Sequence, residues 1–178
     1  MEAAPLVHTN HRVRSAAFGF CLAVIGLYLW QRGGAGPVTW ALVAVQFLVY
    51  PHLLYWRALR SAQPARAELD NLFLDAVLLG AWCAELGFPT WITYFFVGAT
   101  TLNAVVNRGA RGAAWALACT AAGAVLWAAL RRVEYAPLTS QLVTTLCIAG
   151  SLCYAVLVGT VVQKQNRRLA GARDALRA

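Results

Sequence analysis

Long apolar runs separated by short polar turns dominate the chain. A helix needs about 20 mostly apolar residues to cross a hydrocarbon layer of about 30 Å. The runs are continuous and rich in Ala and Leu, without the alternation that marks a transmembrane β-strand. We therefore expect an all-α polytopic membrane protein with six transmembrane helices, at about Ser15–Trp30, Pro37–Trp56, Leu69–Leu86, Phe88–Val106, Gly112–Leu130 and Leu138–Val162.

Charged residues make up only 12% of the chain, whereas soluble domains carry about 25%. The Lys and Arg residues cluster at the ends of the apolar runs. On the six-helix prediction, Arg32, Arg131 and Arg132 lie on one side and the other twelve on the opposite side. The positive-inside rule then predicts N-in, C-in topology in the inner membrane, with both termini cytoplasmic. The net charge of +8 forms no continuous basic face, which argues against a nucleic-acid partner.

Ionisable residues at membrane depth are the candidate site. Arg57 and Glu68 should mark the inner membrane interface on their helices. His52 is five residues, or about 7.5 Å, deeper in the membrane than Arg57, and Asp75 is seven residues, or about 10 Å, deeper than Glu68. The helices that carry them are antiparallel neighbours, so we expect His52 to approach Asp75 or Glu68. The candidate ligand or signal-coupling residues are His52, Arg57, Arg60, Glu68, Asn71 and Asp75. They form either a polar staple between two helices or a sensing site. One His with two carboxylates is a thin ligand set, so we predict no metal.

No catalytic motif is present: the chain has no P-loop, no nucleophile elbow, no HExxH sequence and no dinucleotide fingerprint. The five cysteines, Cys21, Cys83, Cys119, Cys147 and Cys153, lie in apolar runs without CxxC spacing, which favours small buried side chains. We therefore expect no catalytic residues and no cofactor, and this chain by itself is not predicted to be an enzyme.

The last predicted helix carries two patterns for self-association. Ser151, Ala155 and Gly159 form a ladder of small residues, which permits close approach between helices or serves packing within one chain. Val162, Leu169 and Leu176 follow at seven-residue steps, as in a short parallel coiled coil. We assign these six residues to a homodimer interface. Residues 1–163 are then the transmembrane domain, and residues 164–178 begin a cytoplasmic connector helix.

Several sequence blocks resemble the second membrane-associated sensor (MASE) family. The most specific part runs from Pro51 to Trp82 and includes Pro51-His52-Leu53, Arg60-Ser61-Ala62-Gln63-Pro64, Arg66-Ala67-Glu68, Asn71-Leu72 through Asp75, and Gly80-Ala81-Trp82. Phe88-Pro89 and the region from Asn103 to Gly112 also fit. The resemblance covers roughly Arg12 to Arg168.

The resemblance implies a six-span sensor and membrane anchor of a bacterial nucleotide cyclase, followed by a class III adenylate cyclase or a diguanylate cyclase domain. Diguanylate cyclases usually begin with R-D-x-L-T-G-L, but here Arg173-Asp174-Ala175-Leu176 is followed by Arg177-Ala178, which favours an adenylate cyclase. The alternatives are a small transporter, a ligand-binding membrane protein and a purely structural anchor. Membrane lipid, a second copy of the chain and a hydrophobic small molecule or lipid ligand are the expected partners.

Overall fold

The computed structural model describes residues 3–175, and it describes side-chain surroundings for residues 7–164 and Arg167. Helices account for 86% of the chain, and the described residues contain no strand. The elements are α1 (Ala3–Gln31), α2 (Pro37–Ala44), η1 (Val45–Val49), α3 (Tyr50–Arg60), α4 (Pro64–Glu85), α5 (Thr90–Leu130) and α6 (Gln141–Ala175). The all-helical prediction is therefore confirmed.

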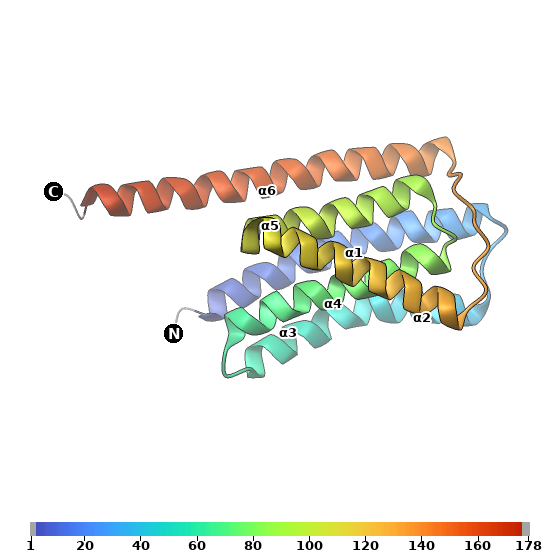
Figure 1. Ribbon diagram of the computed structural model, residues 1–178, viewed down its shortest axis with the longest axis horizontal. Coiled ribbons are helices and arrows are strands. Elements are labelled where there is room, and N and C mark those ends of the chain that lie inside the picture. Colours follow the sequence, from blue (N-terminus) through green and yellow to red (C-terminus); the bar gives the residue numbers. More distant parts are fainter. Residues whose placement is uncertain (1–2, 176–178) are drawn as a thin grey trace.

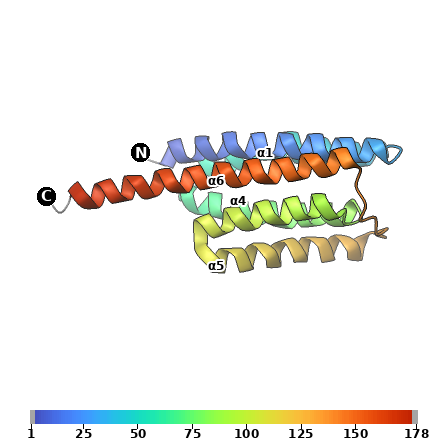
Figure 2. The ribbon, with the colours of Figure 1, turned by 90° about the horizontal axis from the view of Figure 1, so that it is seen from above.

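The helices run along the long axis of the molecule, and both ends of the chain lie at the same end of the bundle (Figure 1). α4 makes its most extensive contacts with α5, and α1 packs against α3, α4 and α6. At the end that holds the termini, α6 projects well beyond the other helices (Figures 1 and 2).

α2, η1 and α3 follow one another without a break and form one continuous helical rod, in which η1 is a π-helical turn. Pro51 lacks an N–H, and its ring conflicts with the carbonyl of the residue four positions earlier, Phe47. The wider turn of η1 ends at Val49, two residues before Pro51, and accommodates this conflict. A π-bulge adds one residue to a turn and so changes which side chains face the bundle on either side of it.

α5 bends sharply at Gly109, which has φ 63° and ψ −156°. This conformation is essentially restricted to glycine. The bend divides α5 into two arms, residues 90–108 and 110–130, that run in opposite directions (Figure 2). Each arm is about 30 Å long at 1.5 Å per residue.

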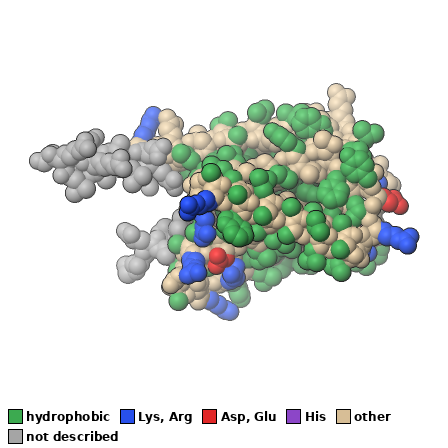
Figure 3. Space-filling view, viewed as in Figure 1, with side chains coloured by type: hydrophobic (Ala, Val, Ile, Leu, Met, Phe, Trp, Pro, Cys, Tyr) green, Lys and Arg blue, Asp and Glu red, His purple; other side chains and the backbone are tan. Residues whose placement is uncertain are grey.

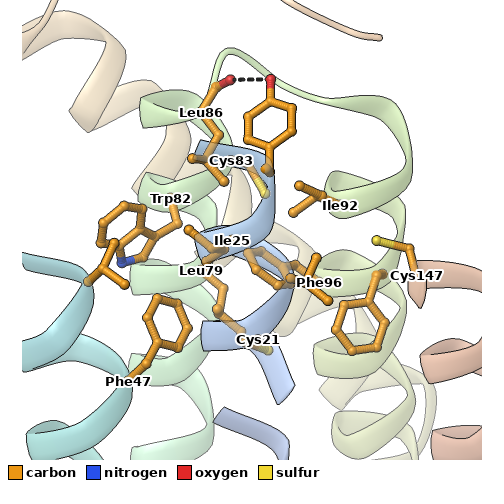
Figure 4. Packing of buried hydrophobic residues seen from close by; sticks show 14 of the residues in the cluster. Cys21, Ile25, Phe47, Leu79, Trp82, Cys83, Leu86, Ile92, Phe96 and Cys147 are labelled. Atoms are coloured by element: carbon orange, nitrogen blue, oxygen red, sulfur yellow. Dashed lines mark hydrogen bonds between the residues drawn. The ribbon is translucent and has the colours of Figure 1, made fainter. Parts of the chain in front are cut away.

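The core lies between α1, η1, α4, the first arm of α5 and α6. Ile25, Phe47, Trp82, Phe96 and Cys147 come from these five elements and are all at least 93% buried (Figure 4). At one edge of this core, the Tyr28 hydroxyl donates a hydrogen bond to the Leu86 carbonyl, 3.2 Å away. These contacts hold the five elements side by side around one core.

Two glycines allow α4 and the second arm of α5 to touch backbone to backbone. A Cβ added at Gly80 would lie 2.0 Å from the Thr120 carbonyl oxygen, and one added at Gly123 would lie 1.9 Å from that of Val77. Close approach through small residues is typical of helix pairs in membranes, where apolar surface alone gives little driving force.

On the face that Figure 3 shows, hydrophobic side chains cover much of the middle of the bundle, and charged side chains lie mainly toward its two ends. Four helices are long and apolar enough to cross a membrane: Val7–Gln31, Pro37–Arg60, Thr90–Leu130 and Gln141–Lys164. α5 counts once although it has two arms. α4 is not among them because every 18-residue stretch of it holds at least three charged residues. Helix length and composition thus support four candidate membrane-spanning helices and do not confirm the six spans expected.

Candidate functional site

A buried ion cluster joins α1 to α4. Glu68 and Asp75 are seven residues apart, so they project from the same face of α4, about 10 Å apart along its axis. Arg14 of α1 lies between them. Its Nη2 is 3.0 Å from Glu68 Oε2, and its Nε is 3.1 Å from Asp75 Oδ2. One guanidinium therefore pairs with two carboxylates through different nitrogens.

The cluster is almost closed to its surroundings. The side chains of Arg14, Glu68 and Asp75 are 10%, 5% and 12% exposed. Arg14 Nη1 and Glu68 Oε1 are both enclosed and have no hydrogen-bond partner from the described protein. A buried ion pair is often no more stabilising than apolar residues of the same volume, and unsatisfied atoms add to its cost. Stability alone is therefore a poor explanation for this cluster, which makes it a candidate for function.

Three further hydrogen bonds join α3 to the same face of α4. The Tyr50 hydroxyl donates to Asp75 Oδ1 at 2.8 Å. Arg57 donates through Nη1 to Asn71 Oδ1, and Asn71 Nδ2 donates to the Leu54 carbonyl at 3.4 Å. Asn71 is completely buried. The polar face of α4 therefore ties α1, α3 and α4 together.

The predicted pairing of His52 with Asp75 or Glu68 is wrong. His52 is exposed, its ring centroid lies 5.0 Å from that of His11, and no ion pair or hydrogen bond joins it to either carboxylate within the described residues. The prediction compared only the two helices adjacent in sequence. α1 also packs against α4, and it supplies a permanently charged guanidinium that can reach both carboxylates.

All three histidines of the chain gather on α1 and α3. The His8 and His11 rings both contact Tyr55, with centroids 5.5 Å and 4.4 Å from it, and His52 contacts His11. The Tyr55 oxygen is 2.8 Å from His8 Nδ1. No group of three or more His, Cys, Asp or Glu side chains in the described part of the chain is placed to hold a metal ion.

The other predicted residues are distributed over two regions. Arg60 is exposed beside Arg57 at the turn between α3 and α4. Ser151, Ala155, Gly159 and Val162 lie on α6. The Leu169 side chain and all of Leu176 lie outside the described residues, as does the predicted coiled-coil contact. Of the cysteines, Cys21, Cys83 and Cys147 are buried, Cys119 is half-buried and Cys153 is exposed.

Sequence reasoning missed Arg14 and Tyr50, although a signal for Arg14 exists. The buried residues of α1 recur at steps of three and four, and Arg14 occupies the same stripe as Phe18, Cys21 and Ile25. A charged residue within a core stripe needs a partner, so the stripe places Arg14 inside the bundle and not in a solvated tail.

The fold and the site together define an all-helical membrane domain with a buried ion cluster and without an evident catalytic domain in residues 3–175. The model of the MASE2 domain family matches residues 10–97, so this half of the chain belongs to the MASE2 family of membrane-associated sensor domains. MASE2 domains are membrane input domains, typically of cyclase-type signalling proteins. No curated protein and no solved structure matches the chain.

Proposed function

We propose that the chain is the signal-input domain of a bacterial class III adenylate cyclase, anchored in the inner membrane as a parallel homodimer. The MASE2 match over residues 10–97 carries this proposal, because the family supplies membrane input to cyclase-type proteins. Arg177-Ala178 after Arg173-Asp174-Ala175-Leu176 disfavours a diguanylate cyclase start. The coding sequence beyond Ala178 tests the output class: a class III cyclase domain is expected there, and a diguanylate cyclase domain contradicts it.

The proposed topology has six crossings. Both arms of α5 are long enough to span, and α4 crosses inside the bundle with Glu68 and Asp75 neutralised by Arg14. An unpaired carboxylate at mid-membrane costs about 2.5–3.5 kcal/mol on insertion scales, and the ion pairs offset this cost. The bias of basic residues supports a cytoplasmic location for both termini.

Reporter fusions at Ala178 and Gly34 test this topology. Gly34 lies in the turn between α1 and α2, at the end of the bundle opposite to the termini (Figure 1). A cytoplasmic reporter should be active at Ala178, and a periplasmic reporter at Gly34. Periplasmic activity of the Ala178 fusion contradicts the topology.

The small-residue face of α6 supports the dimer. α6 packs on its own bundle through Val143, Cys147 and Gly150, and a Cβ added to Gly150 would clash with Phe20. Ala155 and Gly159 lie roughly 100° or more around the helix from this packed side. Ala155 is exposed, and a Cβ added at Gly159 meets nothing within 4 Å. The ladder is thus open to a second copy.

Cysteine cross-linking in native membranes tests the dimer. Ala155→Cys is introduced into a chain whose five cysteines are replaced, and the control chain retains only Cys153. Both positions are exposed on α6, but two residues correspond to 200°, so they face opposite ways. We expect dimer-sized products from Ala155→Cys and far fewer from Cys153. No product from Ala155→Cys, or more from Cys153, contradicts this interface.

A further inference from the structure

An open groove of about 560 Å³ lies at the turn between α3 and α4. Arg57 and Arg60 line it from α3, and Arg66 and Asp70 line it from α4. Basic side chains gather over this end of the bundle (Figure 3). We propose that this groove binds the phosphate of an anionic phospholipid headgroup. This binding depends neither on the dimer nor on the identity of the output domain.

The groove carries uncompensated positive charge. Three guanidinium groups face one carboxylate, and none of the three has an ion-pair partner within residues 7–164. Arg60 lies over the Trp56 ring, 5.3 Å from its centroid, which restricts its position. Guanidinium groups are suited to phosphate because they donate paired N–H bonds in a planar fork. An anion with several acceptor oxygens matches this arrangement.

The flank of the groove favours a lipid over a free phosphate ion. Leu53, Trp56 and Arg60 follow steps of three and four, so they share one face of α3. Leu53 is 57% exposed and Trp56 is 56% exposed. This face therefore presents an apolar side chain, an aromatic ring and a guanidinium over about 10 Å. That order matches the acyl chain, the interfacial region and the phosphate of a phospholipid.

Arg57 connects the groove to the buried polar face of α4. Arg57 lines the groove, and its guanidinium donates to Asn71 Oδ1. Asn71 lies between Glu68 and Asp75 in sequence, on the same helix as both. A phosphate that draws Arg57 into the groove therefore competes with its bond to Asn71. If the chain acts as the sensor proposed above, this bond is the route from lipid to ion cluster.

Native mass spectrometry of the full chain in mild detergent tests the binding, with phosphatidylglycerol titrated against phosphatidylcholine. We expect Arg60→Gln with Arg66→Gln to weaken phosphatidylglycerol binding by roughly tenfold to thirtyfold. The matched control is Arg108→Gln with Arg111→Gln. It removes two exposed arginines near the Gly109 bend, at the same end of the bundle but outside the groove. The control should retain nearly full affinity.

Equal losses in the two double variants would show general charge attraction and overturn the site. Trp56→Ala, which keeps every charge, should weaken phosphatidylglycerol binding by a few fold. A second experiment adds inorganic phosphate at millimolar concentration to compete with phosphatidylglycerol. If it displaces the lipid fully, or if Trp56→Ala has no effect, the groove is a free-phosphate site and the lipid assignment fails. Equal melting temperatures of the variants confirm that their folds are intact.

Discussion

Replacing Arg14 with Met tests the ion cluster most directly. The change leaves Glu68 and Asp75 with side chains that are 5% and 12% exposed and without their cation. At an effective dielectric constant of about 20, each pair near 3 Å contributes about 5 kcal/mol of Coulomb attraction. Desolvation of the three ions offsets much of this. We expect Arg14→Met to lower the free energy of unfolding by about 3–5 kcal/mol, as found when one partner of a buried pair is removed.

The assay is reversible unfolding of the full chain in mixed micelles, followed by far-ultraviolet circular dichroism. Arg12→Met is the matched control. Arg12 is exposed on the same helix, and its replacement removes the same charge from the same segment. It should cost less than about 0.5 kcal/mol. Because both variants reduce the positive charge of the N-terminal segment equally, a difference between them does not come from altered topology.

Removing the carboxylates as well should restore stability. The triple variant Arg14→Met, Glu68→Gln, Asp75→Asn leaves no uncompensated charge in the cluster, so it should recover at least half of the loss. If Arg14→Met is no less stable than Arg12→Met, the cluster contributes no buried charge pairing and the reasoning fails. A triple variant less stable than Arg14→Met alone would refute it in the same way.

Two further predictions concern neighbouring contacts. Gly80→Ala should destabilise the fold by about 1–3 kcal/mol, because its Cβ would lie 2.0 Å from the Thr120 carbonyl oxygen. A Cβ added at Gly98 meets nothing within 4 Å, so Gly98→Ala should be neutral or stabilising in the same assay. Equal effects at the two glycines would contradict the close contact between α4 and α5. Tyr50→Phe removes the 2.8 Å hydrogen bond to Asp75 and should cost about 1.5–3 kcal/mol. The cost should shrink in an Asp75→Asn background, and an unchanged cost would show that the bond is not responsible.

Much of the architecture was predictable because each membrane helix depends mainly on the residues of its own segment. Apolar runs of sufficient length, ended by Gly, Pro and charged residues, predicted the helices, but α1 begins at Ala3, twelve residues before the expected Ser15. α4 illustrates the limit of this reasoning. Its charges lower its hydropathy, and only the partners supplied by α1 and α3 show how it is accommodated inside the bundle. The bend at Gly109 lay between two predicted helices, but its backbone conformation was not predictable from composition.

The candidate site was predicted in part. Glu68, Asn71 and Asp75 were selected because their spacing puts them on one face of a helix, and the structure places them on a polar face that packs inside the bundle. Their partners were misassigned. His52 was chosen as the ionisable group at membrane depth on the adjacent helix. In the structure it is Tyr50, at the start of α3 just after η1, whose hydroxyl contacts Asp75.

The sequence by itself determined the helical class, the polar face of α4 and the family resemblance, because these depend on residue type and on spacing within one segment. Only the tertiary structure decided that Arg14 neutralises both carboxylates and that Arg57 holds Asn71. Helical periodicity specifies which side of a helix is polar, but it carries no information about which other helix lies against that side. That choice follows from packing among distant segments, including the glycine contacts of α4 with α5 and the core shared by α1, η1 and α6.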